Sequence, residues 1–148
     1  MIINGASIYG VNIFGNPALY DFSTWTFTNG NSTGTSGPTV ANLRVLYDTT
    51  GNTWINNDAY FSTTNGIQLW TVPQTGTYTI TARGASSGMA NVGLGASIAG
   101  TFTLNRGEII RIIVGQMGGN TTAFYSGGGG GSFVVRTPFN SNASILTI

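Results

Sequence analysis

Gly127-Gly128-Gly129-Gly130-Gly131, followed at once by Ser132-Phe133-Val134-Val135-Arg136, joins a run of glycines directly to a short apolar segment. Glycine has no side chain to bury and loses more backbone entropy on folding than any other residue. An ordered glycine run is therefore stabilised by close packing of its backbone, or it lies exposed as a flexible loop. We treat Gly127, Gly128, Gly129, Gly130 and Gly131 as a structural glycine-rich segment.

The chain around this segment alternates as half-buried β-strands do. Residues 76–82 place Tyr78, Ile80 and Ala82 on one face and threonines on the other. Residues 109–114 are apolar on both faces, which predicts a central strand. Further short strands are expected at 22–27, 53–55, 59–61, 67–72, 100–104, 132–135 and 145–148, with an Asn65-Gly66 hairpin turn before residue 67. This spacing predicts a β-sandwich or jelly roll with about eight to ten strands.

One short helix is expected within this all-β chain. Pro38 stands where a first helical residue tolerates proline, and Val40, Leu43 and Tyr47 follow at i, i+3 and i+7. Asp48-Thr49-Thr50-Gly51 closes the segment. The helix should pack its apolar stripe on a sheet.

The chain divides at about residue 20. Residues 1–20 hold short apolar pieces separated by glycine and asparagine, which we interpret as an N-terminal arm or edge strand for attachment to a neighbouring protein. The alternative is that they form the sandwich's own edge strand. Residues 21–148 form one glycine-rich β-sandwich domain. The candidate assembly residues of the arm are Ile8, Tyr9, Val11, Ile13 and Phe14.

Charge is scarce in the 148 residues. The chain has five arginines, four acidic residues and no lysine, and its net charge is +1. Such a chain lacks the basic surface that neutralises phosphates, so we expect no nucleic-acid partner. The N-terminus has no basic region followed by a long apolar run, and no segment reaches the ~20 apolar residues that span a bilayer, so we expect neither a signal peptide nor membrane insertion.

The residue types argue against an enzyme. The chain has no histidine and no cysteine, which removes the usual general base, the thiolate nucleophile and most transition-metal ligands. Asp48 and Asp58 form the one carboxylate pair weighed for glycoside hydrolysis, but aspartates near glycine and asparagine are usually turn residues. Gly93-Leu94-Gly95 lacks the third glycine of a dinucleotide loop, because residue 98 is Ile98. We expect no catalytic residue, no cofactor and no metal.

The tryptophans have two interpretations. Trp25, Trp54 and Trp70 would stack on sugar rings if they were exposed. In a small β-domain, however, a tryptophan is first a core or interface residue. We therefore expect the core.

A series of motifs occurs in a characteristic order. They are Ser36-Gly37-Pro38-Thr39, Gly66-Ile67-Gln68-Leu69-Trp70-Thr71-Val72-Pro73, Gly76-Thr77-Tyr78-Thr79-Ile80, Gly84-Ala85, Gly100-Thr101-Phe102-Thr103-Leu104, Val114-Gly115-Gln116-Met117-Gly118 and the glycine run ending in Phe133-Val134. Together they resemble the glycine-rich module of phage and viral tail fibres and adhesins, over about residues 22–135. The module is similar to the glycine-rich ligand-binding region of anaplastic lymphoma kinase receptors.

The resemblance implies a tumour-necrosis-factor-like or jelly-roll sandwich whose glycine segments pack as polyglycine helices in a hexagonal bundle. The sequence departs from that pattern at Gly84-Ala85-Ser86-Ser87-Gly88, which is poor in glycine. The glycine run 127–131 therefore forms either part of such a bundle or a single tight crossover. The receptors of the family are secreted and carry cysteine, whereas this chain has none.

These observations favour a non-enzymatic virion structural protein, a fibre or adhesin domain of a phage tail or capsid. We expect a virion location after synthesis in the host cytoplasm. The expected partners are further copies of the chain, as a homotrimer, other virion proteins, and a host-surface glycan or protein. The alternatives are a capsid decoration protein and a cell-surface carbohydrate-binding module.

Overall fold

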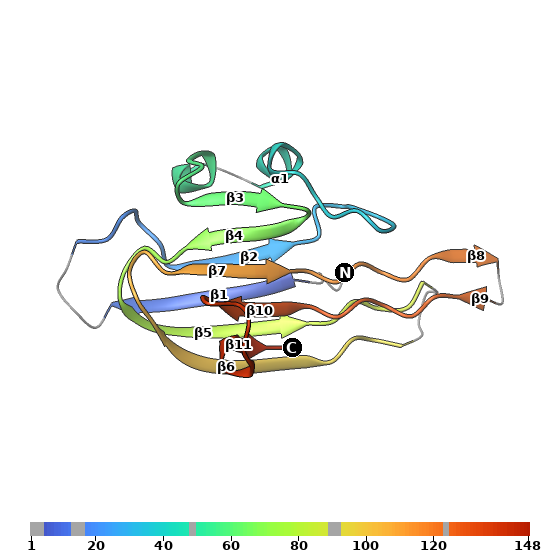
Figure 1. Cartoon of the computed structure of the whole chain (residues 1–148). Coiled ribbons are helices and arrows are strands. Elements are labelled where there is room, and N and C mark those ends of the chain that lie inside the picture. The colour runs from blue at the N-terminus through green and yellow to red at the C-terminus, as the bar shows by residue number, and fades with distance from the viewer. Residues whose placement is uncertain (1–4, 13–16, 48–49, 89–92, 123–124) are drawn as a thin grey trace.

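The computed structural model describes residues 5–12, 17–47, 50–88, 93–122 and 125–148. Two antiparallel sheets face each other, one with strand order β2-β1-β5-β6 and the other with order β11-β10-β7-β4-β3, and β8 pairs separately with β9 (Figure 1). The strands are β1 (Gly5–Asn12), β2 (Thr24–Thr28), β3 (Phe61–Thr64), β4 (Ile67–Thr71), β5 (Gly76–Arg83), β6 (Ser97–Leu104), β7 (Ile109–Ile113), β8 (Asn120–Thr122), β9 (Tyr125–Ser126), β10 (Phe133–Arg136) and β11 (Ile145–Thr147). The expected all-β sandwich is confirmed.

The core lies between the sheets, as the sequence alternation predicts. On β5, Tyr78, Ile80 and Ala82 are buried while Thr79 is exposed. On β7, the middle strand of its sheet, Ile110 and Ile112 are buried and the alternate residues are exposed. The expected central strand is confirmed, since β7 has two strands of its sheet on either side, and only one of its two apolar faces is buried.

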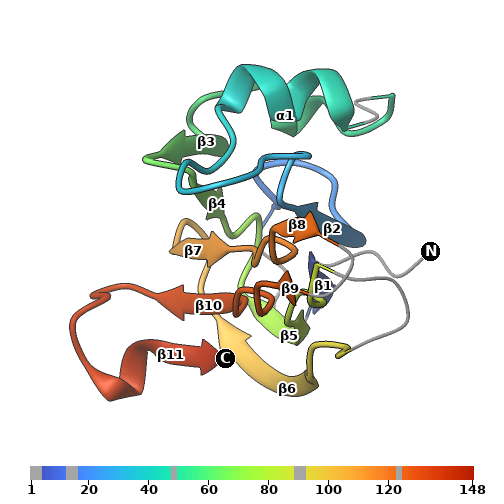
Figure 2. The same cartoon turned by 90° about the vertical axis from the view of Figure 1, so that its right-hand side faces the viewer.

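The helix and the hairpin form where the sequence predicts them. Helix α1 (Val40–Leu46) begins after Thr39, whose hydroxyl accepts the Asn42 N–H, and it buries Leu43 in the core. The β3–β4 turn uses Asn65 and Gly66, both with positive φ (50° and 78°), as a two-residue hairpin of this hand requires. Figure 2 shows α1 lying beyond the β3 edge of the sandwich.

Residues 53–55 are not the expected strand. They belong to a 3-10 helix, η1 (Thr53–Asn56), in which the Ile55 N–H bonds to the Asn52 carbonyl. Trp54 and Ile55 are consecutive and both buried. Consecutive strand residues point to opposite faces, so a strand here would expose one of these large side chains. A second 3-10 turn, η2 (Asn142–Ser144), precedes β11.

The N-terminal strand is not an edge strand. β1 lies between β2 and β5; it pairs with β2 over residues 5–9 and with β5 over residues 6–12. Ile8 is fully buried in the core, whereas Tyr9 on the outer face is 54% exposed. Residues 5–12 are thus an interior strand of the sandwich, and they are paired on both sides rather than free to add to another sheet. Among the described residues, no helix is long and apolar enough to cross a membrane.

Candidate functional site: a bundle of glycine segments

The strands continue beyond one end of the sandwich as glycine segments. Residues 84–88 follow β5 and residues 93–96 precede β6, so this pair leaves the four-stranded sheet. Residues 115–119 follow β7 and residues 127–131 precede β10, so this pair leaves the other sheet. Figure 1 shows them running outward from the sandwich to the β8–β9 hairpin, which closes one pair at the outer end.

Backbone hydrogen bonds join these segments with a period of three residues. The N–H groups of Gly84 and Ser87 donate to the carbonyls of Ala96 and Gly93. Those of Ala85 and Gly88 donate to Gly130 and Gly127, at 2.9 and 3.2 Å. Ser86 accepts from the Gly118 N–H at 3.2 Å. Residues 84–88 therefore face a different neighbour at each successive position, which is the three-residue repeat of a polyproline-II helix.

The same period links the two segments that leave the five-stranded sheet. Gly127 and Gly130 donate to the carbonyls of Gly119 and Gln116, both at 2.9 Å. Gly127 and Gly130 also accept from residues 88 and 85, so each ties two neighbours together. Of the two arrangements left open for the glycine run 127–131, these hydrogen bonds support membership of a bundle over a single tight crossover.

Close backbone approach explains why glycine is needed here. A Cβ atom added at Gly95, Gly115 or Gly118 would collide with the carbonyl oxygen of Gly84, Gly130 or Gly127, respectively. A Cβ at Gly129 would collide with the Ala85 carbonyl. Packed sheets stay ~10 Å apart because side chains fill the space between them. Where the side chains end, the backbones of the two sheets come into direct contact.

Sequence reasoning identified residues 127–131 but missed the other members. Residues 84–88 form part of the bundle although only Gly84 and Gly88 are glycine, and Ala85 between them is buried. Gly93 and Gly95, weighed as a nucleotide loop, pack against Ser87 and Gly84. The signal that identifies the members is their position, since each lies at the end of a long strand.

A groove runs along one side of the bundle. Its volume is about 840 Å³, and loop 29–34 forms the opposite wall. Gly30 and Asn31 hold this loop in the left-handed region (φ 62° and 56°). The described residues that line the groove carry no charged side chain. They are Asn29, Asn31, Ser32, Thr33, Gly34, Ile113, Val114, Gly115, Gln116, Met117, Gly118, Gly119, Gly128 and Gly130.

Gln116 stands where this groove meets a smaller one of about 230 Å³ under the β3–β4 turn. Its Nε2 donates to the Ser36 carbonyl at 3.0 Å. Its Oε1 is buried and has no hydrogen-bond partner in the described part of the chain. A buried acceptor without a partner is costly, so it attracts a donor from a ligand or from water.

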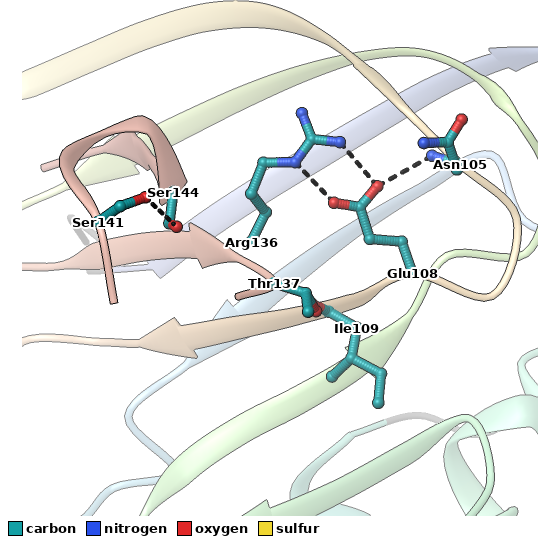
Figure 3. A network of polar contacts seen from close by, with 7 residues as sticks. All are labelled: Asn105, Glu108, Ile109, Arg136, Thr137, Ser141 and Ser144. Carbon is teal, nitrogen blue, oxygen red and sulfur yellow. Dashed lines mark hydrogen bonds and ion pairs between the residues drawn. The ribbon is translucent and has the colours of Figure 1, made fainter. Parts of the chain in front are cut away.

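The opposite end of the sandwich is held by an ion pair (Figure 3). Arg136 donates to both carboxylate oxygens of Glu108, at 2.6 and 2.9 Å, and Glu108 accepts the Asn105 N–H at 3.0 Å. The Thr137 hydroxyl donates to the Ile109 carbonyl at 3.2 Å. These contacts fix the turn before β7 against the end of β10, which is a structural role.

Two of the five predicted arm residues, Ile8 and Tyr9, point to opposite faces of β1. Ile8 is in the core and Tyr9 is on the outer face of the sheet. Val11 lies in β1 opposite Thr77. Ile13 and Phe14 lie outside the described residues. Asp58, of the weighed carboxylate pair, is exposed and ion-paired with Arg44 at 2.7 Å, while Asp48 lies outside the described residues.

The tryptophans belong to the core, as expected. Trp54 and Trp70 are buried, and Trp25 packs edge-on against Trp54. Three tyrosines join this aromatic layer. Burial raises the pKa of Tyr78 to about 12 and also raises the pKa values of Tyr20 and Tyr47. Within the described residues, no group of three or more histidine, cysteine, aspartate or glutamate side chains is arranged to hold a metal ion.

Comparison with known proteins gives a partial similarity. No family model matches the chain. Over 99 residues, or 64% of its length, the chain is 35% identical to the leukocyte tyrosine kinase receptor of Mus musculus. It spans 11% of that receptor's length. The chain is therefore similar, over about two thirds of its own length, to a small part of a receptor tyrosine kinase.

Proposed function

We propose that this protein is a non-enzymatic structural and recognition domain of a virus particle. In this proposal it is a fibre or adhesin domain of a phage tail or capsid. It assembles as a homotrimer, docks on other virion proteins, and contacts a glycan or protein of the host surface with the outer end of the glycine bundle.

The glycine bundle carries this proposal. It is rigid, because its segments are cross-linked by backbone hydrogen bonds at every third residue. It also holds the β8–β9 hairpin away from the sandwich (Figure 1). A stiff support that carries a hairpin at its outer end suits surface recognition better than chemistry. The near-neutral, hydroxyl- and amide-rich surface suits a particle exposed to varying salt and pH.

The experiment is a cell-binding assay with fluorescently labelled protein on a panel of bacterial strains. We expect binding to some strains and not to others. Replacement of the whole β8–β9 hairpin, residues 120–126, by an Asn-Gly turn should abolish binding, while the pair Thr79→Ala and Thr101→Ala on the outer face of the sandwich should leave it unchanged. Absence of binding at high micromolar concentration would exclude the adhesin role and leave capsid decoration.

Assembly is tested separately by light scattering. A homotrimer predicts a native mass near three times the 15.4 kDa of the chain. A monomer would mean that the symmetry is imposed by the particle on which the protein sits, which favours a decoration protein.

The similarity to a receptor favours a second candidate, a binding module within a larger receptor-like protein. This candidate predicts monomeric protein that captures a protein ligand and binds none of the bacterial strains.

A further inference from the structure

Two glycines of the bundle are not explained by the fold. A Cβ at Gly119 or Gly128 would meet no atom of the described residues within 4 Å, and neither residue has the positive φ that favours glycine. Glycine in such a position costs stability relative to alanine through the entropy of the unfolded chain. Both residues line the groove beside loop 29–34. Glycine without an internal steric need indicates that another backbone approaches from outside.

The wall of the groove also has unused hydrogen-bonding groups. Within the described part of the chain, the backbone N–H and C=O groups of Met117 and Gly128 have no hydrogen-bond partner. These positions follow Gln116 and Gly127, which are bonded within the bundle. With a three-residue repeat, the next position on each helix faces the next neighbour. The open side therefore has the hydrogen-bonding pattern of the bundle interior.

We propose that this groove binds a glycine-rich segment of a partner protein in the polyproline-II conformation. The segment would add one more helix to the bundle, as an extended peptide adds a strand to an open sheet edge. It must be rich in glycine, because the bundle packs backbone against backbone. Proline is excluded where a donor is needed, because it has no N–H.

The shape of the groove argues against a two-fold contact with a second copy of this chain, and light scattering tests for a head-to-tail contact. A two-fold interface requires a surface that is complementary to itself, and a concave groove is not. At about 840 Å³ the groove is within the range of ~300–1,000 Å³ typical of ligand sites. The uncharged lining fits a neutral peptide backbone.

The test is fluorescence anisotropy of a fluorescein-labelled (Gly-Gly-Ser)4 peptide titrated with the full chain. We expect saturable binding with a dissociation constant on the order of micromolar. Gly119→Val and Gly128→Val should each weaken it about tenfold or more without lowering the melting temperature, because their side chains fill the groove and not the bundle. Ala99→Val, on the outer face of β6, is the matched control and should bind as the unmodified protein does.

Three results would overturn the proposal. One is no saturable binding up to millimolar protein. Another is equal binding of a (Val-Thr)6 peptide, which favours strands over polyproline II. The third is self-association, seen by light scattering, that Gly128→Val abolishes while peptide binding is absent. If one glycine variant fails to fold, the other decides the outcome. Met117→Ala is then added and must leave peptide binding intact, because only the backbone of Met117 is proposed to bond to the peptide.

Discussion

Gln68 is a buried amide at the junction of the two sheets, and it is only 1% exposed. Its Oε1 accepts from the Tyr47 hydroxyl and its Nε2 donates to the Thr28 carbonyl, both at 2.8 Å. The Tyr47 hydroxyl in turn accepts the Thr28 N–H at 2.9 Å. Three residues, from β2, β4 and the end of α1, thus satisfy one another's side-chain and backbone groups.

Gln68→Leu should destabilise the protein by about 2–4 kcal/mol, because the Tyr47 hydroxyl and the Thr28 carbonyl lose their partners while remaining buried. Urea denaturation measures this change. Thr79→Val, on the exposed face of β5, is the control and should change the unfolding free energy by less than ~0.5 kcal/mol. A loss below ~1 kcal/mol for Gln68→Leu would mean that water enters the site.

Gly118 and Gly119 are adjacent, but alanine substitutions at the two positions should have opposite effects on stability. Gly118→Ala places a methyl group against the Gly127 carbonyl and should cost about 2–4 kcal/mol. Gly119→Ala meets open space and should be neutral or stabilise by up to ~1 kcal/mol, because alanine restricts the unfolded chain. Thermal and chemical denaturation of the two single variants provide the comparison. Equal losses would show that the bundle is packed differently.

At the scale of elements, the sequence predicted what alternation and turn chemistry control. Residues 76–82, the Asn65-Gly66 hairpin and α1 form where expected, because each depends on residues close in the chain. The 3-10 turn at Trp54 and the interior position of β1 were not predicted, because both depend on long-range packing. The bundle was predicted only at 127–131, since its partners come from strands distant in sequence.

The aromatic layer between the sheets gives a prediction for alkaline pH. Tyr20, Tyr47 and Tyr78 have raised pKa values in the folded protein, whereas the unfolded chain releases these protons near pH 10. The unfolded state then binds fewer protons than the folded state, so the unfolding free energy falls as pH rises above about 10, through the Tyr78 pKa of about 12. Below pH 9 these groups contribute no pH dependence.

This behaviour is measured by following tyrosinate absorbance and near-ultraviolet circular dichroism together from pH 8 to 13. We expect part of the tyrosine absorbance to change only where tertiary structure is lost. Tyr78→Phe should unfold at a higher pH than the unmodified protein, when the two are compared under conditions that give them equal unfolding free energies at neutral pH. Titration of all six tyrosines near pH 10 in the intact fold would contradict the burial.

At the scale of the whole molecule, β1 joins one edge strand of its sheet to the rest. β2 pairs only with β1, and β1 pairs with β5. Removal of residues 1–12 therefore takes away Ile8 from the core and leaves β2 without a partner. We expect this truncated chain to lose cooperative unfolding and NMR shift dispersion.

Removal of residues 1–4 alone should leave the melting temperature within about 3 °C of the full chain, because β1 begins at Gly5. A cooperative, folded chain lacking residues 1–12 would show instead that residues 5–12 act as a detachable arm.

The glycine bundle also limits how this protein can evolve. In an ordinary core, a harmful substitution is often compensated when a neighbouring side chain changes size. At Gly95, Gly115, Gly118 and Gly129 the neighbour is a carbonyl group, which no second mutation alters. Lineages that carry this bundle must therefore keep those glycines and accumulate their variation at the hairpin tip, in the loops and on the open faces of the sheets.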